Sequence, residues 1–187
     1  MDPPRRTRVH CGPKPARTDG ARCRARQGGC ELGLLGSSSP VNPSGLDVLH
    51  VEDQPFVVVA APGGAIEDDV TVRPEELAGQ KLIASRTGSL MRTIVDDITA
   101  GGTGTEIVTI VDHRTSILPL VLTGVGVAVL PSSWTRLARR CGAVVAPIEP
   151  TAHLHVAMVS LPAHLTPAAR AFLTLTKSLA QRRVRGP

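Results

Sequence analysis

Aromatic residues are scarce in this chain, which has one tryptophan, two phenylalanines and no tyrosine among 187 residues. Proteins that bind single-stranded nucleic acid stack bases on aromatic side chains, so this class is disfavoured. Catalytic motifs are also missing, because no GxSxG or HExxH pattern occurs. The glycines at 124 and 126 follow an expected helix and precede a strand, which reverses the order of a dinucleotide fingerprint. We therefore expect neither an enzyme nor a cofactor.

Paired cysteines and long apolar runs are absent too. The four cysteines, Cys11, Cys23, Cys30 and Cys141, contain no CxxC pair, which argues against a structural zinc site. The N-terminus lacks the apolar core of a secretion signal, which favours reduced thiols and a cytoplasmic location. The longest apolar run, 117–130, is too short to span a membrane. We expect no membrane association.

Two histidines raise the question of a metal site. His153 and His155 would face the same side of a strand, but no third ligand stands near them in the sequence. A pair of imidazoles alone is more typical of a polar strand face. The acidic pairs at 68–69 and 96–97 likewise indicate solvated charges, and we predict no metal.

Positive charge is concentrated at the N-terminus. The first 30 residues hold eight Lys or Arg and two Asp, a net charge of +6, whereas the whole chain carries +5, which leaves −1 for the remainder. Residues 1–29 have almost no large aliphatic side chains, which favours a disordered tail. An alternative is that this GC-codon-rich segment comes from a shifted reading frame or a misplaced start and is not native sequence.

The stretch 107–131 predicts one complete α/β unit. Residues 107–111 are β-branched and predict a strand, and Thr115 or Ser116 is expected to cap a helix that tolerates Pro119 in its first turn. Gly124 ends that helix, and a short apolar run up to residue 131 is typical of a strand buried on both faces of a mostly parallel sheet.

Further elements follow the same rules. Strands are expected at 31–35, 56–60, 81–85, 144–148 and 153–161, and residues 41–50 are expected to form a loop and a return strand. Helices are expected at 72–79, after Ser89, after Ser132 or Ser133, and from Thr166 onward. The terminal helix should bury a face of five residues, namely Ala168, Ala171, Phe172, Leu175 and Leu179.

Several of these segments together resemble the effector-binding region of LysR-type transcriptional regulators. The resemblance rests on CELGLLG at 30–36, FVVVAAPGG at 56–64, VRPEELAGQKLIASRTGSLMR at 72–92, LVLTGVGVAVLP at 120–131 and LTPAARAFL at 165–173. It covers roughly residues 29–179 in the family's order. The winged helix-turn-helix, the linker helix and the first two β/α units of the family are not found before residue 30.

The resemblance implies an α/β fold of the type 2 periplasmic-binding-protein kind, with two lobes joined by crossing strands and the first lobe incomplete. We expect a partial first lobe from 30–57 with 152–182 and a second lobe at 58–151. It also implies a small anionic metabolite as effector, homo-oligomers in the full-length family, and DNA contact only through a domain missing here.

Two loops are candidates for effector binding, each at the carboxyl end of a strand and the start of a helix, where backbone N–H groups favour anions. The candidate residues are Ser85, Thr87, Gly88, Ser89, Thr115 and Ser116. Gly88 and Ser89 are equally explained as a turn and a helix cap. If the two strands are parallel neighbours, both loops lie on one edge and face the other lobe.

Three other functions stay open from the sequence. A stand-alone solute-binding protein shares the two-lobe plan but requires an export signal. A small α/β enzyme would need acid, base or nucleophile motifs. A gene remnant without activity would express poorly because of unpaired strand edges.

Overall fold

The structure is a computed structural model, and it describes residues 30–41, 45–100, 104–161 and 165–184. The strands are β1 (Leu32–Ser37), β2 (Asp47–Ala60), β3 (Lys81–Ser85), β4 (Glu106–Val111), β5 (Ala128–Pro131), β6 (Val144–Pro147) and β7 (His153–Ser160). The helices are α2 (Leu90–Thr99), α3 (Ile117–Leu122), α4 (Thr135–Arg140) and α5 (Pro167–Val184), with 3₁₀ turns η1 (Pro74–Leu77), η2 (Arg114–Ser116) and η3 (Ser132–Trp134). The expectations for 1–29 lie outside the described residues.

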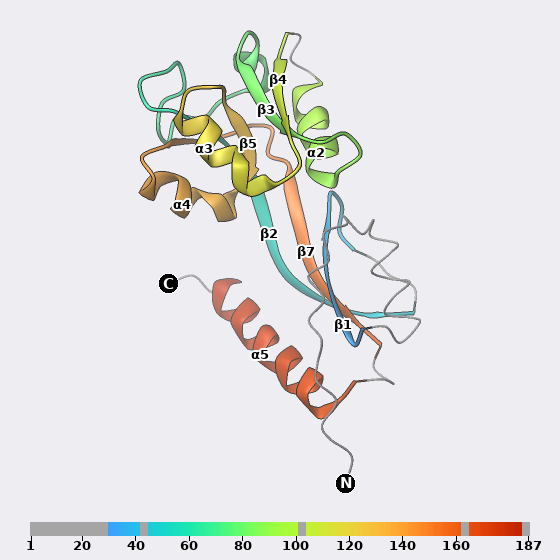
Figure 1. The fold of residues 1–187 in the computed structure, drawn as a ribbon. Coiled ribbons are helices and arrows are strands. Elements are labelled where there is room, and N and C mark those ends of the chain that lie inside the picture. The colour runs from blue at the N-terminus through green and yellow to red at the C-terminus, as the bar shows by residue number, and fades with distance from the viewer. Residues whose placement is uncertain (1–29, 42–44, 101–103, 162–164, 185–187) are drawn as a thin grey trace.

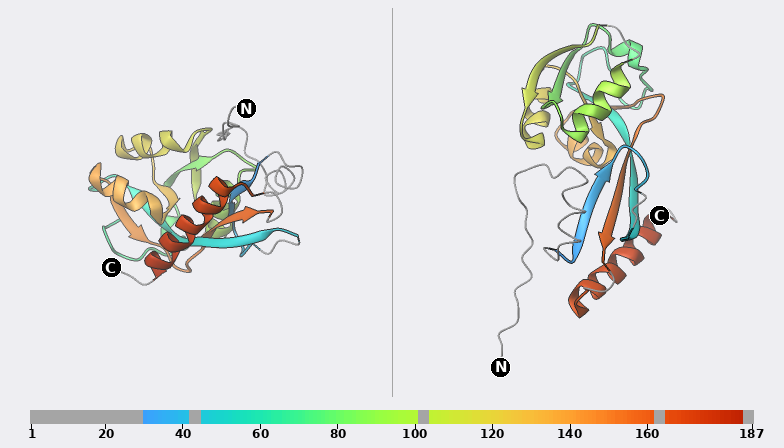
Figure 2. Two further views of the ribbon diagram at one scale, coloured as in Figure 1. Left: turned by 90° about the horizontal axis from the view of Figure 1, so that it is seen from below. Right: turned by 90° about the vertical axis from the view of Figure 1, so that its right-hand side faces the viewer.

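Two bodies are connected by the long strands β2 and β7 (Figure 1). We call the body with β3–β6 and α2–α4 the upper lobe and the body with β1 and α5 the lower lobe. Figure 2 shows β1, β7 and β2 side by side in the lower lobe, with α5 across their far ends. Strand β2 is a single element of 14 residues, where the sequence suggested two separate strands. The exact lobe limits stay a prediction.

The sheets are mixed, which corrects the expectation of a mostly parallel sheet. In the lower lobe β7 lies between β1 and β2 and is antiparallel to both. In the upper lobe β5 and β6 are antiparallel to β2, while β3 and β4 are parallel to each other. A parallel bridge between Leu82 and Val127 connects β3 to β5.

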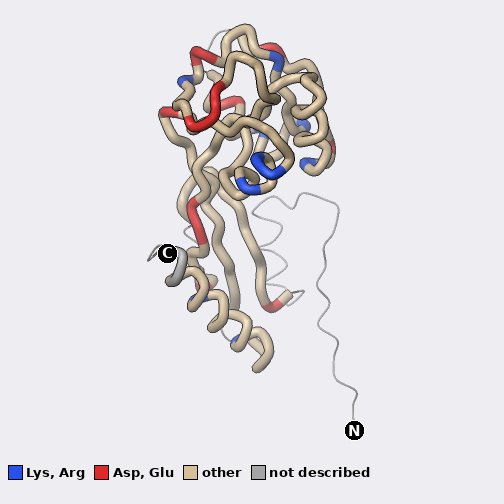
Figure 3. Tube along the Cα trace, turned by 90° about the vertical axis from the view of Figure 1, so that its left-hand side faces the viewer, with Lys and Arg blue, Asp and Glu red and all other residues tan. Residues whose placement is uncertain are grey.

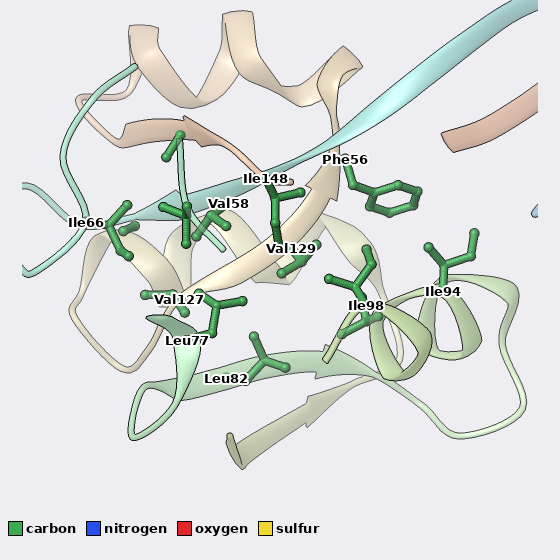
Figure 4. Close-up of a cluster of buried hydrophobic side chains, with 14 of the residues drawn as sticks. Phe56, Val58, Ile66, Leu77, Leu82, Ile94, Ile98, Val127, Val129 and Ile148 are labelled. Carbon is green, nitrogen blue, oxygen red and sulfur yellow. The ribbon is translucent and has the colours of Figure 1, made fainter. Parts of the chain in front are cut away.

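The upper lobe has a core on each side of β2. On one side lie Phe56, Val58, Leu77, Leu82, Ile94, Ile98, Val129 and Ile148, shown in Figure 4. On the other side lie Val57, Val59, Ile83, Ile117, Val121, Ala128 and Leu130. Successive strand residues point to opposite faces, so the uninterrupted apolar run 56–60 is buried because helices or turns cover both faces.

Local signals placed several elements correctly. Pro74 opens η1, and Gly79 follows it with a φ of +76°. Helix α2 begins directly after Ser89 and buries Met91, Ile94, Val95 and Ile98. Pro119 lies in the first turn of α3, as expected, and Gly124 follows the helix with a φ of +76°. These signals need no knowledge of distant partners.

The buried face of α5 differs from the prediction. Phe172, Leu175 and Leu179 are 53–63% exposed, whereas Ala169 and Ala180 are buried. Helix α5 contacts β2, and small side chains let a helix approach its neighbour closely. The helix therefore carries two apolar stripes, and the one with the larger side chains has no cover in the part of the chain that is described.

Capping is the other point of correction in the upper lobe. Neither Ser132 nor Ser133 caps α4 through its side chain, because the serines form η3, which leads straight into α4.

In the lower lobe, Thr166 caps α5 as expected, since its hydroxyl accepts a hydrogen bond from the N–H of Ala169 at 3.3 Å. Glu31 holds this cap by accepting from the N–H of Thr166 at 2.6 Å. Among the described helices, none is long and apolar enough to cross a membrane.

Candidate functional site

The carboxyl ends of β3 and β4 lie side by side. The two strands are parallel, and Ser85 pairs with Val111 at the last position of each. The loops 86–89 and 112–116 therefore leave the sheet at the same edge, which confirms this part of the prediction. The pairing of β3 with β4 shifts register between Leu82 and Ile83, but the carboxyl ends of the two strands stay aligned.

In loop 86–89, Gly88 and Ser89 have structural roles. Gly88 has a φ of +80°, a conformation that suits glycine. The hydroxyl of Ser89 accepts a hydrogen bond from the N–H of Arg92 at 3.2 Å and donates one to the carbonyl of Arg86 at 2.8 Å. Gly88 and Ser89 thus form the turn and the cap of α2.

Ser85 and Thr87 have no such role. Ser85 is half-buried and Thr87 is exposed, and neither side chain hydrogen-bonds to any described residue. Two hydroxyls of this loop are therefore available to a ligand.

Loop 112–116 departs from the expected capping. Ser116 occupies the cap position of α3, but its φ of −81° and ψ of −14° are helical and its side chain makes no cap hydrogen bond. The preceding turn η2 supplies the acceptors instead, because the N–H of Ile117 bonds to the carbonyl of Arg114. Thr115 and Ser116 are exposed, and in the described structure their hydroxyls bond to no other residue.

The first turn of α2 approaches the lower lobe. A methyl group added at Gly36, near the end of β1, would lie 3.5 Å from Leu90 Cδ2 and 3.2 Å from Leu154 Cδ1. The upper end of β1 lies beneath α2 in both Figures 1 and 2. The end of β1 therefore lies close to the start of α2.

Charges around this edge are mixed. Arg86 and Arg114 are exposed in the two loops, and Asp112 lies beside Arg114 in the sequence. Arg92 donates from Nε to Asp96 at 2.6 Å, while its second nitrogen, Nη1, is buried without a partner in the described structure. Figure 3 shows Lys and Arg interspersed with Asp and Glu over the upper lobe. The edge offers hydroxyls, a helix N-terminus and scattered cations, a set that suits a small anion.

An open hollow of about 470 Å³ lies elsewhere in the upper lobe. It is lined by segments 60–66, 79–81 and 124–127, so it meets β3 at Lys81, the end opposite Ser85. Its lining is mostly Gly, Ala and Val, and only Gln80 and Lys81 bring polar side chains. The hollow is distinct from the candidate loops and lacks their hydroxyls.

The prediction that the acidic pair at 68–69 is only solvated is corrected by its contacts. Asp68 and Asp69 are not merely solvated: Asp68 accepts from the N–H of Val145 at 2.9 Å, and both acids pair with Arg139. These contacts hold the loop before η1 against β6 and α4, and the acids raise the pKa of Arg139.

His155 does have potential co-ligands, namely His50 and Asp53. Hydrogen bonding to His50 is the main cause of the lowered pKa of Asp53.

Cys30 and Cys141 are free thiols, and the other two cysteines lie outside the described residues.

A family model described as the LysR substrate binding domain matches residues 14–181. A search of curated proteins gives no significant match. Among solved structures, the Corynebacterium glutamicum OxyR C206 mutant is 20% identical, with a TM-score of 0.69, over 90% of this chain and 52% of that one. This chain thus spans about half the length of that protein.

Two isolated domains are also similar. The Synechocystis PCC6803 CcmR regulatory domain in complex with 2-PG is 16% identical, with a TM-score of 0.68, over 85% of this chain and 77% of that one. The effector binding domain of QuiR in complex with shikimate is 20% identical, with a TM-score of 0.66, over 88% of this chain and 78% of that one. At these identities the likeness shows the fold alone.

Proposed function

Because this chain belongs to the family of LysR substrate-binding domains, we propose that it senses a small anionic metabolite and does not catalyse a reaction. The effector would bind at the carboxyl edge of β3 and β4, between loops 86–89 and 112–116. The hydroxyls of Ser85, Thr87, Thr115 and Ser116 are the proposed contacts. Gly88 and Ser89 would contribute the turn and the helix N-terminus that orient them.

The observation that carries this proposal is the pairing of Ser85 with Val111 at the ends of two parallel strands. It gathers at one edge the proposed contact hydroxyls of the two loops, which stand at least 28 positions apart in the sequence, Thr87 and Thr115 being the nearest pair. These four hydroxyls have no hydrogen-bond partner among the described residues. If a ligand covered them without bonding to them, their loss of water would cost free energy. A ligand carboxylate or phosphate that closes over the edge would supply those partners.

The similar structures are consistent with a ligand of this kind, because CcmR and QuiR were solved with 2-PG and with shikimate. In a longer regulator the bound effector would alter how subunits associate and how a separate DNA-binding domain holds its promoter. We propose that this chain contributes the sensing part, within a homo-oligomer, and contacts DNA only through such a domain.

A catalytic role has no support from the contacts. None of the side-chain hydrogen bonds among the described residues joins a Ser, Thr or Cys to a histidine side chain, the arrangement that activates a nucleophile. The hydroxyls of the candidate loops therefore fit binding better than attack on a substrate.

Ligand-induced stabilisation of the chain tests the proposal. Sodium shikimate, inorganic phosphate and a set of small mono- and dicarboxylates would be screened by thermal shift. A ligand at one hundred times its Kd stabilises by about 2.7 kcal/mol, which for a chain of this size raises Tm by roughly 5–10 °C.

The decisive comparison is between two variants. Thr87→Ala with Thr115→Ala should abolish the shift caused by any ligand found, whereas Ser133→Ala, an exposed serine of η3, should preserve it. Equal shifts in both variants would place the ligand elsewhere, and a screen in which no carboxylate or phosphate stabilises the chain would count against an anionic effector.

A further inference from the structure

Three metal-binding side chains converge where β2 and β7 run together. Asp53 Oδ1 lies 2.8 Å from Nε2 of His50 and 2.6 Å from Nδ1 of His155. One potential ligand atom from each of the three residues lies within 4.8 Å of the other two. These residues lie on β2 and β7, and none of them belongs to loops 86–89 and 112–116.

A β-bulge makes this convergence possible. His50 and Asp53 are three positions apart, so a regular strand would point them to opposite faces. The register of β2 against β7 slips between His50 and Glu52: His50 pairs with Ala157, and Asp53 pairs with His155. Since 155 and 157 share a face of β7, the extra residue at Val51 brings both β2 side chains to the side of His155.

We propose that His50, Asp53 and His155 bind a divalent transition metal of the zinc type. Imidazole nitrogens and a carboxylate oxygen are the ligands that Zn²⁺ accepts, and three protein ligands with water in the fourth position is a common zinc arrangement. The donor set lacks sulfur and has only one carboxylate, which disfavours Cu⁺ and Ca²⁺.

The spacing of the donor atoms suits such an ion after a small adjustment. Ligands about 2.0–2.1 Å from a tetrahedral metal lie about 3.3 Å apart. The hydrogen-bonded pairs at 2.6 and 2.8 Å must therefore open by about 0.5–0.7 Å, and the two histidine nitrogens, which lie within 4.8 Å of each other, must approach by about 1.5 Å at most. The hydrogen bonds hold the three groups close to the required positions before the metal arrives.

The three proposed ligands differ in solvent exposure and in packing. The side chain of His155 is only 18% exposed, whereas those of His50 and Asp53 are about half exposed. The ring of His155 stacks on that of His153, with centroids 6.2 Å apart and planes 28° apart. One anchored imidazole and two accessible ligands leave an open side through which a hydrated cation enters and keeps a water.

The metal would join the two strands that connect the lobes. Two of its ligands come from β2 and one from β7, and both strands continue from the lower into the upper lobe (Figure 1). A bound ion would therefore resist separation or sliding of these strands. This inference does not depend on the proposed effector.

Zinc titration of the full chain tests the site. Isothermal calorimetry with ZnSO₄ would be run on the wild-type chain and on a variant with all four cysteines changed to serine, since thiolates also bind zinc. Both proteins should bind one equivalent at the histidine site. Co²⁺ in place of zinc should give the visible absorption bands of a four-coordinate site with nitrogen and oxygen ligands.

Single substitutions assign the ligands in the serine background. His155→Ala and Asp53→Ala should each weaken zinc binding at least tenfold, because even residues that only hydrogen-bond to ligands contribute that much. His113→Ala, an exposed histidine of another loop, should leave the affinity unchanged.

A second readout guards against misfolding. His50→Ala removes the most exposed ligand, so it should keep the circular dichroism spectrum and still lose zinc affinity. Unchanged affinity in the His155 and Asp53 variants, or loss of binding when the cysteines are replaced, would overturn the proposal.

Discussion

Replacing Gly126 with alanine should be among the most damaging single-methyl changes in the upper lobe. A Cβ atom at this position would lie 2.4 Å from the carbonyl oxygen of Lys81 and 3.0 Å from its carbon. Both neighbours are backbone atoms of β3, so no side-chain rotation relieves the contact. Ordinary van der Waals contact begins near 3.4 Å, and the two strands must therefore separate by about 1 Å.

That separation breaks the two backbone hydrogen bonds that join these segments. The N–H of Val127 donates to the carbonyl of Lys81 at 2.8 Å, and the N–H of Ile83 donates to the carbonyl of Val127 at 2.8 Å. Stretched by about 1 Å, both exceed hydrogen-bonding distance. Each lost bond costs about 1 kcal/mol, and a buried group left unpaired costs about 1–3 kcal/mol. We expect a loss of about 2–4 kcal/mol in the free energy of unfolding.

Urea unfolding and thermal melts of a glycine series would measure this loss. At this chain length the expected decrease in Tm for Gly126→Ala is about 5–15 °C. Gly64→Ala is the neutral control, because the nearest atom to its Cβ is 3.8 Å away. Gly142→Ala has open space but a φ of +85°, so it should cost about 1–2 kcal/mol from backbone strain alone. If Gly126→Ala melts within about 2 °C of Gly64→Ala, the close approach of β3 and β5 is wrong.

Three further changes test the cap, the core and the exposed stripe. Ser89→Ala removes the cap of α2 and should cost about 1 kcal/mol in urea unfolding, whereas Ser133→Ala should cost less than about 0.5 kcal/mol as a surface substitution. Leu77→Ala empties a fully buried position of η1 and should cost about 2–5 kcal/mol by the same assay. Phe172→Ser with Leu175→Ser removes exposed apolar area from α5 and should reduce concentration-dependent association in sedimentation velocity; unchanged association would exclude this stripe as its cause.

Elements with local start and stop signals could be predicted from the sequence. The apolar run at 81–85 predicts β3 to the residue. The cap and the apolar spacing predict α2, because a cap and a 3.6-residue period involve neighbours along the chain. The same is true of η1, where Pro74 and Gly79 delimit a single turn. The order of these elements also carried the family resemblance that the match over residues 14–181 confirms.

Strand β2 shows what local signals miss. Its middle contains Glu52 and Asp53, polar residues that separate the two strands expected from the sequence, within 41–50 and at 56–60. The structure extends it because β7 provides a continuous antiparallel partner from Ser160 to His153. The pairing depends on residues about a hundred positions away, which no local pattern contains.

For the same reason, the local sequence around His155 does not predict His50 and Asp53 as its potential co-ligands. Only His153 stands near it in the sequence, since the other two donors lie on β2. Even with the strand pairing known, a regular strand would have placed only one of His50 and Asp53 on the correct face. The bulge between His50 and Glu52 is a departure from regular geometry, and no glycine or proline marks it in the sequence.

Hydroxyls in the candidate site illustrate a related ambiguity. Ser89 and Ser116 both precede a helix after a parallel strand, and the sequence gives each the same capping role. They diverge because the backbone of Ser89 is extended, with a ψ of 148°, whereas that of Ser116 is already helical, with a ψ of −14°. Only the extended conformation turns the side chain back onto the first N–H groups of the helix. Loop 112–116 satisfies those groups with backbone carbonyls of its 3₁₀ turn, which frees the hydroxyl of Ser116 for a ligand, while Ser89 is committed to α2.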